Sequence, residues 1–248
     1  MKDLSNFDWG WMNKLTKKTI WDPNIEKDIP LNEYHKNSMI DEIFERKQYE
    51  EIYQVKEGDV VVDIGASIGP FTYSILDKNP KVVYCLEPSI SEFKTMKKNL
   101  PFDNVYLINK GITHSDCITK SNFIFEEITD DSGILLTDFN GTKFSSFIKH
   151  NHIDYIDFLK TDCEGGEYHI FMDENMDFLL NNVGCIVGEW HLGTELEKVE
   201  FKYFRDKYLK QFKTVEVRSV DGVDIKWELY KDNFIEYYNQ VIFHINNK

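Results

Sequence analysis

Residues 60–69 read VVVDIGASIG and indicate the class of fold. The continuous apolar run from Val60 to Ile64 is β-branched almost throughout, which is typical of a strand covered on both faces. Gly65 and Gly69 allow the chain to turn directly into a helix, which we expect to run through residues 71–76. A buried strand followed at once by a helix favours an α/β fold.

The same alternation of strand and helix continues toward the C-terminus. We expect further strands at residues 82–86, 105–108, 155–159 and 185–187, and helices at 89–100, 143–150, 168–180 and 196–212. Residues 214–218 and 237–245 supply two closing strands with no convincing helix between them. We therefore predict a Rossmann-like α/β domain with a mostly parallel seven-stranded sheet, helices on both faces and one antiparallel strand near the C-terminus.

Two regions depart from this regular pattern. Residues 1–34 show no clean helical or strand period and are rich in aromatic residues, so we expect them to form an N-terminal arm. The rest of the chain, 35–248, is expected to be a single domain. Its first element is expected to be one amphipathic helix at 35–53. Trp9, Trp11 and Trp21 of the arm are expected to pack onto that domain; a substrate lid or a contact between copies of the chain is the alternative.

The second irregular region is an insertion at about residues 114–150. Its residues 122–128 alternate like a half-exposed strand, and Gly133 and Asn140-Gly141 indicate turns.

Composition excludes several classes of protein. The 248 residues carry 43 acidic and 29 basic side chains, a net charge of −14, and no dense cluster of lysine or arginine, so that nucleic acid is not the expected partner. No apolar stretch approaches the ~18 residues of a membrane-spanning helix, and acids stand where a signal peptide needs an apolar region. The four cysteines contain no C-x-x-C pair, and we expect a cytoplasmic protein with reduced thiols.

The carboxyl ends of the strands are where an open α/β sheet binds its ligands. Ser67 stands where the dinucleotide fingerprint G-x-G-x-x-G has its second glycine, which disfavours NAD. Glu87 follows the second strand, at a distance from the glycine turn that suits an acid accepting hydrogen bonds from ribose hydroxyls; the alternative is an acid that merely begins a helix. Together these residues predict a ligand that contains a nucleoside.

The fourth strand is followed by the block KTDCEGGE at residues 160–167. With the turn at 63–69 and Glu87-Pro88, this block resembles the FkbM family of S-adenosylmethionine-dependent methyltransferases, over roughly residues 55–190. The resemblance implies a class I methyltransferase fold and S-adenosylmethionine as cofactor. It implies contacts to the cofactor from Asp63, which supports the turn, from the backbone of Gly65, Ala66, Ser67 and Gly69, from Glu87 at the ribose and from Gly111 near the adenine.

Methyl transfer requires an acceptor oxygen held in line with the methyl group and a base for its proton. The candidates for that base are Asp162, Glu164, Glu189 and His191, of which Asp162 is our first choice. His191 is expected to titrate near neutrality, although a packed, hydrogen-bonded histidine is an equal alternative. Glu164 and Glu167 could instead satisfy backbone amides at a helix start.

A metal site is not expected. Asp162, Glu189 and His191 could converge, but the sequence has no dense ligand motif.

The leading hypothesis is an S-adenosylmethionine-dependent O-methyltransferase that acts on a sugar hydroxyl. The resemblance favours a role in cell-surface polysaccharide biosynthesis, as in a capsule or lipopolysaccharide. The first alternative keeps the cofactor and changes the acceptor to a nucleotide-activated sugar or a small natural product. The second is a non-catalytic protein that binds S-adenosylmethionine.

Overall fold

The fold is built on a central sheet. The computed structural model describes the whole chain except Met1 and residues 15–18, 23–25, 122–136 and 232. Seven of the described strands form this sheet in the order β11-β12-β10-β9-β3-β4-β5. Their bounds are Val60–Ile64 for β3, Val82–Leu86 for β4, Val105–Ile108 for β5, Ile156–Thr161 for β9, Val183–His191 for β10, Thr214–Arg218 for β11 and Gln240–Asn246 for β12. Only β12 among these runs antiparallel to its neighbours, β10 and β11. The predicted mixed sheet is confirmed.

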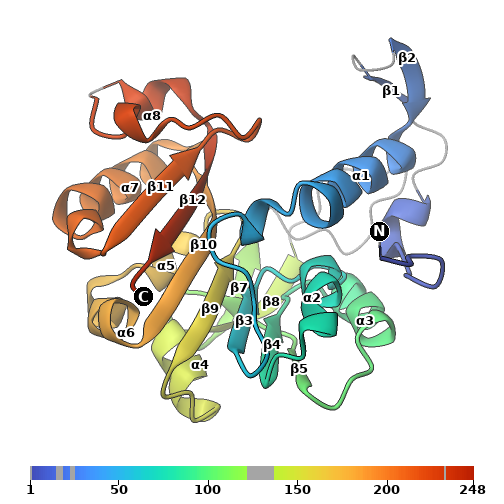
Figure 1. Ribbon diagram of the computed structural model, residues 1–248, viewed down its shortest axis with the longest axis horizontal. Coiled ribbons are helices and arrows are strands. Elements are labelled where there is room, and N and C mark those ends of the chain that lie inside the picture. The colour runs from blue at the N-terminus through green and yellow to red at the C-terminus, as the bar shows by residue number, and fades with distance from the viewer. Residues whose placement is uncertain (1, 15–18, 23–25, 122–136, 232) are drawn as a thin grey trace.

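Helices cover both faces of the sheet (Figure 1). One face is covered by α2 (Pro70–Ile75) and α3 (Ile90–Asn99), whose apolar residues pack against Val61 and Val83. The other is covered by α4 (Phe144–His150), α5 (Glu167–Ile170), α6 (Met176–Asn181) and α7 (Glu195–Lys207). Because side chains alternate along a strand, Val61 and Val62 enter different cores, and the central strands β3, β9 and β10 are buried on both sides. The Rossmann-like α/β architecture follows from this double covering.

The single helix expected at residues 35–53 is wrong. Helix α1 (Leu31–Met39) continues as a π-helical segment (Ile40–Glu45), and the chain then turns at Lys47, which has a left-handed φ of 52°. A 3₁₀ turn (Gln48–Glu50) follows, and the ring of Tyr49 packs against that of Phe71 with 5.7 Å between centroids. Burial of Tyr49 against α2 therefore outweighs the local preference for a continuous helix.

Two other expected helices are shorter than predicted. The helix expected at 168–180 is divided into α5 and α6 because the Asn175 side chain donates to the carbonyls of His169 and Ile170, where α5 ends. Helix α7 ends at Lys207, and a 3₁₀ turn (Leu209–Gln211) completes the segment expected to be helical to residue 212.

Near the C-terminus, a four-residue helix α8 (Phe234–Tyr237) precedes β12, in a region where no helix was expected.

Within the insertion, β7 (Ile118–Ser121) and β8 (Thr137–Thr142) form a small sheet with β6 (Gly111–Ile112), which lies just before it. The turn predicted at Asn140-Gly141 is wrong, since both residues lie in β8 and Asn140 pairs with Ile118. The strand expected at 122–128 and the turn at Gly133 lie outside the described residues.

The N-terminal segment packs against the turn that follows β3. Phe7 and Met12 are buried with Ile68, and the Asn99 amide donates to the carbonyls of Asp8 and Ile68. Beyond a 3₁₀ helix (Gly10–Lys14), strands β1 (Thr19–Asp22) and β2 (Lys27–Pro30) form a hairpin that projects from the rest of the molecule (Figure 1). Of the helices described, none combines the length and the apolar character that crossing a membrane requires.

His244 in β12 predicts acid sensitivity. Its side chain is buried, and burial, followed by the charge of Arg218, lowers the pKa of His244 to about 4. In the unfolded chain the pKa of a histidine is about 6.5, so the folded protein binds a proton on His244 less readily than the unfolded chain does. The stability of the fold therefore falls as the pH drops from about 6.5 toward 4. We expect the free energy of unfolding of the wild type, relative to His244→Gln, to be about 2 kcal/mol lower at about pH 5 than at about pH 7.5.

Urea unfolding at the two pH values measures this difference. The matched control is His150→Gln, at an exposed position, whose difference in stability from the wild type should be the same at both pH values. An offset between wild type and His244→Gln that is equal at both pH values would contradict the prediction.

Candidate active site

The turn after β3 lies against the end of β9. Gly65 has a φ of +75°, and a Cβ atom built on it would lie 1.7 Å from the carbonyl oxygen of Asp162. Gly69 has a φ of +88° and ends the turn at the start of α2. Only glycine fits at position 65, because both the backbone conformation and the contact with β9 exclude a side chain. The turn therefore approaches the residues after β9 through its bare backbone.

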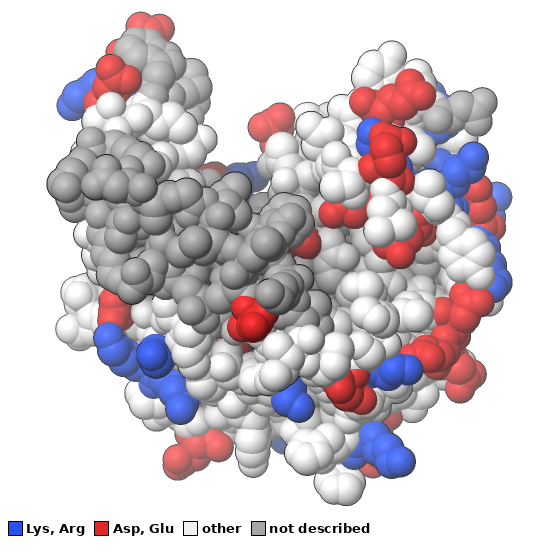
Figure 2. All heavy atoms as spheres, turned by 180° about the vertical axis from the view of Figure 1, so that it is seen from behind, with Lys and Arg blue, Asp and Glu red and all other residues white. Residues whose placement is uncertain are grey.

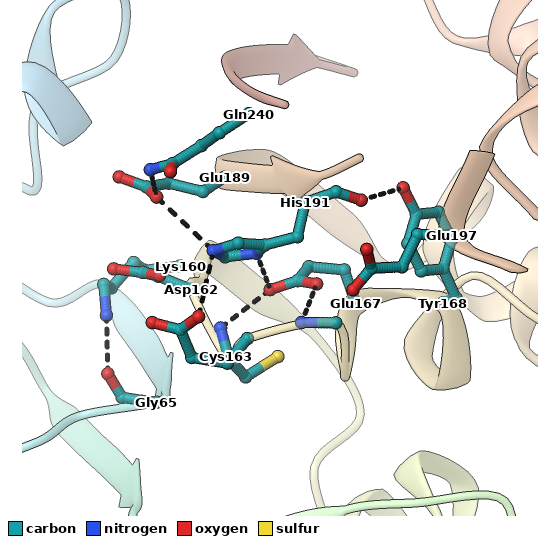
Figure 3. A network of polar contacts seen from close by, with 12 residues as sticks. Gly65, Lys160, Asp162, Cys163, Glu167, Tyr168, Glu189, His191, Glu197 and Gln240 are labelled. Atoms are coloured by element: carbon teal, nitrogen blue, oxygen red, sulfur yellow. Dashed lines mark hydrogen bonds and ion pairs between the residues drawn. The ribbon is translucent and has the colours of Figure 1, made fainter. Parts of the chain in front are cut away.

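A buried ion pair holds this turn in place. Lys160 Nζ lies 3.1 Å from Asp63 Oδ1 and donates a 2.8 Å hydrogen bond to the carbonyl oxygen of Gly65 (Figure 3). Thr72 Oγ1 donates to the second carboxylate oxygen of Asp63 at 2.8 Å. Burial alone would lower the pKa of Lys160, but the charges of Asp63 and Asp162 outweigh it and raise that pKa. Asp63 thus acts on the turn through Lys160, a partner that the sequence analysis did not assign.

Glu87 lies at the end of β4 and is buried. Its Oε2 accepts a hydrogen bond from the backbone N–H of Ser67 at 2.8 Å, and its Oε1 accepts from that of Ser89 at 2.7 Å. Burial, reinforced by the nearby Glu92, raises the pKa of Glu87 well above its usual value. The carboxylate is therefore fixed beside the glycine turn, and the structure brings Asp63, the turn and Glu87 together.

Gly111 lies in β6, beside the residues that follow β4. A Cβ atom on Gly111 would lie 3.3 Å from Pro88 and 2.6 Å from the ring of Phe139. The Asn109 side chain donates to the carbonyls of Glu87 and Pro88 and ties the end of β5 to that of β4. All the residues expected to bind the cofactor therefore lie at or after the carboxyl ends of three neighbouring strands, with Asp63 still inside β3.

The residues considered for catalysis lie next to this turn, after β9 and in β10. One ligand atom each of Asp162, Glu189 and His191 lies within 4.8 Å of the other two. Tyr49 donates a 2.8 Å hydrogen bond to Asp162 Oδ2, and the Gln240 amide donates to Glu189 Oε2. Tyr49 was missed in the sequence because it stands in the segment taken for a continuous amphipathic helix.

A buried carboxylate orients the imidazole of His191 (Figure 3). Glu167 Oε1 lies 3.2 Å from His191 Nδ1, and the two oxygens of Glu167 accept hydrogen bonds from the backbone N–H groups of Cys163 and Gly165. The alternative assigned to Glu167, satisfaction of backbone amides, agrees with this geometry. His191 Nε2 faces the opposite way, 3.5 Å from Glu164 Oε2 and 3.7 Å from Glu189 Oε2.

The expectation that His191 titrates near neutrality is wrong for the protein without ligands. Burial alone would lower the pKa of His191, but its hydrogen bond to Glu167 and the charges of Glu167, Asp162 and Glu164 raise it to about 10. Burial, followed by the charge of Asp162, raises the pKa of Glu189 to about 9. The hydrogen bond to Glu167 and the negative charge of the surrounding carboxylates therefore favour a proton on the imidazole at neutral pH. In that state His191 has no lone pair with which to act as a base.

Trp190 and Trp9, whose rings could stack on a sugar face, pack instead against other aromatic rings. Trp190 is fully buried and stacks on Phe243 with 4.1 Å between ring centroids. Trp9 packs edge-on against Phe7 at 5.0 Å. The side chains of Trp11 and Trp21 lie outside the described residues.

Comparison with known proteins matches residues 63–219, more than half of the chain, to a family model described as the methyltransferase FkbM domain. No curated protein matches the sequence. Among solved structures, an rRNA methylase from Streptococcus thermophilus is 12% identical, with a TM-score of 0.45 over 78% of this chain and 89% of that one. A precorrin-6y C5,15-methyltransferase from Geobacter metallireducens is 13% identical, with a TM-score of 0.44 over 89% and 90%. A proposed methyltransferase from Streptococcus mutans, solved with S-adenosylhomocysteine, is 12% identical, with a TM-score of 0.44 over 77% and 90%.

Proposed function

Because the chain belongs to the FkbM family of methyltransferases, we propose that its carboxylate-lined site methylates a hydroxyl group of a sugar. The family establishes the enzyme class and S-adenosylmethionine as the methyl donor. The acceptor is our proposal. It is supported by the polar groups that surround the end of β9.

The described residues fit the cofactor. The backbone of Gly65 to Gly69 has room for a ligand where a side chain would be excluded, and Glu87 offers a fixed carboxylate to ribose hydroxyls. When bound, the cofactor supplies a methyl group on a positively charged sulfur. The carboxylates around Asp162 favour such a cation. We assign the cofactor-binding role to Asp63, Gly65, Ala66, Ser67, Gly69, Glu87 and Gly111.

The observation that carries the sugar proposal is the set of carboxylates beyond the turn. Asp162 and Glu164 lie close to His191, and ionised carboxylates only accept hydrogen bonds. They therefore suit an uncharged acceptor rich in hydroxyl donors and repel a phosphate backbone. We assign Asp162 and Glu164 to binding the acceptor and receiving its proton, and His191 to positioning them.

The surface agrees with an acceptor other than nucleic acid. On the face shown in Figure 2, the described lysines and arginines lie in small groups between carboxylates. The net charge of −14 disfavours nonspecific attraction to a phosphate backbone. On the family resemblance we extend the proposal to the sugars of a cell-surface polysaccharide, such as a capsule or lipopolysaccharide, methylated in the cytoplasm.

A second candidate, a nucleotide-activated sugar, is favoured by a cavity of about 250 Å³ next along the sheet. It is lined by Arg46 and Arg218 among other residues, and by Ile242, which pairs with Glu189 in the register of β12 and β10. A diphosphate there would find two guanidinium groups, although Arg46 and Arg218 already pair with Asp41 and Glu51. Inhibition of methyl transfer by free GDP or UDP would favour this candidate over a polymer acceptor.

The deciding experiment offers the protein methyl-labelled S-adenosylmethionine and a panel of nucleotide sugars and surface polysaccharides. We expect one sugar class to gain a single methyl group by mass spectrometry. Transfer to RNA or to a small natural product, with none to any sugar, would overturn the sugar proposal while leaving the methyltransferase assignment intact.

Glu87→Gln predicts a loss of cofactor affinity. The substitution removes a charged acceptor that we place at the ribose and sets an amide N–H against the backbone N–H of Ser67 or Ser89. Hydrogen bonds to a charged group contribute about 1.5–3 kcal/mol, so we expect S-adenosylhomocysteine to bind about 10- to 100-fold more weakly by isothermal titration calorimetry. Glu92→Gln removes a charge from the same region without removing these bonds and should change the affinity by less than about 3-fold. Equal losses in the two variants would argue against a ribose-binding role for Glu87.

A further inference from the structure

We propose that Asp162, Glu189 and His191 bind a divalent metal ion, which holds two neighbouring oxygens of the acceptor. The proposal that the ion binds is argued from these side chains and their neighbours and does not depend on the proposed function. The role given to it in catalysis rests on the proposed function. This inference revises the sequence expectation that the protein has no metal.

The first argument is the convergence of the three side chains. Asp162 directly follows β9, Glu189 and His191 lie in β10, and the two strands are parallel neighbours with Gly188 paired to Thr161. Their ligand atoms lie within 4.8 Å of one another. The ligands of one six-coordinate ion with bonds of about 2.1 Å lie about 3 to 4.2 Å apart, so that small side-chain rotations complete the site. Regular strands, which are more rigid than loops, carry Glu189 and His191.

The second argument is the orientation of His191, which is set by a residue other than the three proposed ligands. Buried Glu167, held by the backbone N–H groups of Cys163 and Gly165, engages Nδ1 at 3.2 Å. Nε2 is thereby turned toward Glu164 and toward Glu189, to which a dashed line runs in Figure 3. A carboxylate on one ring nitrogen of a histidine is the usual arrangement behind a metal ligand, because it fixes the ring and makes the other nitrogen a better donor.

The third argument is the excess of negative charge. The carboxylates of Asp162 and Glu189 repel each other, and Glu42 adds to the repulsion of both. The nearest lysine, Lys160, is committed to Asp63 and the carbonyl of Gly65. Carboxylates this close together and largely buried require a cation or protons. In the protein without ligands protons fill this role, and a divalent ion displaces them when it binds.

The donor set narrows the choice of ion. Two carboxylates and one imidazole suit Mn²⁺ or Mg²⁺ better than a thiolate-preferring ion. Three protein ligands leave three positions of an octahedral ion, two of which two adjacent acceptor oxygens can occupy. The acceptor class this site fits is therefore a sugar with neighbouring oxygens, such as a vicinal diol.

The transfer step balances with the groups named. The ion withdraws electron density from the acceptor hydroxyl, whose O–H bond breaks as the proton passes to the solvent-accessible carboxylate of Glu164. The acceptor oxygen forms a bond to the methyl carbon as the carbon–sulfur bond of S-adenosylmethionine breaks. The electron pair of that bond stays on sulfur. The products are the methyl ether, S-adenosylhomocysteine and the proton released from Glu164 to water.

Mn²⁺ binding to the purified full chain, stripped with EDTA and dialysed, tests the proposal by electron paramagnetic resonance and calorimetry. We expect one Mn²⁺ per chain, and at least about 10-fold weaker binding in Asp162→Asn, Glu189→Gln and His191→Gln. His150→Gln, the same substitution on an exposed histidine, should bind like the wild type. Stabilisation by S-adenosylhomocysteine in a thermal-shift assay should persist in each variant and show that it is folded.

Two results would overturn the proposal: no Mn²⁺ binding by the wild type at millimolar ion, or equal binding in the wild type and all three variants. The methylation assay separates this failure from failure of the proposed function. Full sugar methylation by the EDTA-stripped enzyme would reject the metal's role in catalysis and keep the sugar acceptor. Stoichiometric Mn²⁺ binding that depends on the three residues, with no sugar methylated, would keep the metal site and reject the sugar.

Discussion

Gly65→Ala is expected to lower the free energy of unfolding by at least about 3 kcal/mol and to abolish binding of S-adenosylhomocysteine. The new Cβ atom would lie 1.7 Å from the carbonyl oxygen of Asp162, so that the turn after β3 and the end of β9 must separate. The left-handed φ of +75° adds backbone strain for any residue other than glycine. Urea unfolding and calorimetry with S-adenosylhomocysteine measure the two effects.

Gly58→Ala is the matched control. Gly58 has a φ of +84°, and a Cβ atom there would meet nothing within 4 Å, so the substitution tests backbone strain without the clash. We expect it to cost about 1 kcal/mol and to leave cofactor binding unchanged. Similar losses of stability in the two variants would show that the contact with Asp162 is not what requires glycine at position 65.

Lys160→Met should cost about 3–5 kcal/mol of unfolding free energy, because it leaves the carboxylate of Asp63 buried without a cation. The carbonyl of Gly65 also loses its hydrogen bond from Nζ. We therefore expect weaker binding of S-adenosylhomocysteine together with the lower stability. Adding Asp63→Asn to this variant removes the unpaired charge and should restore part of the stability, as measured by urea unfolding.

An exposed ion pair provides the control for Lys160. Lys207 lies 2.7 Å from Asp173, and both side chains are about half exposed. Lys207→Met should cost far less stability than Lys160→Met because solvent screens the pair. If the two lysine substitutions cost the same, the ion pair between Lys160 and Asp63 does not stabilise the turn as we describe.

Much of the sheet could be predicted because its signal is local. Residues 60–64, 82–86 and 105–108 form β3, β4 and β5 with the predicted bounds. Continuous apolar runs identify such strands, although β5, at the edge of the sheet, leaves Tyr106 exposed. The cap of α3 was also local, with Ser89 accepting from the backbone N–H of Glu92. Helix ends set by distant contacts were missed. Burial of Tyr49 against Phe71 and the donation by Asn175 to α5 depend on residues that a helical period does not register.

For the candidate site, too, residues with a local sequence signal could be predicted, and contacts between residues distant in the sequence could not. Gly65, Gly69, Glu87 and Asp162 could be chosen from the sequence because the ends of parallel strands meet at one edge of a sheet. Their partners could not, since Lys160 contacts Asp63 and Tyr49 contacts Asp162 across roughly a hundred residues of chain. The convergence of Asp162, Glu189 and His191 was considered from the sequence but could not be established there, and the protonation of His191 was not predicted. Both depend on burial and on distances between charges, which exist only after strands far apart in the chain lie side by side.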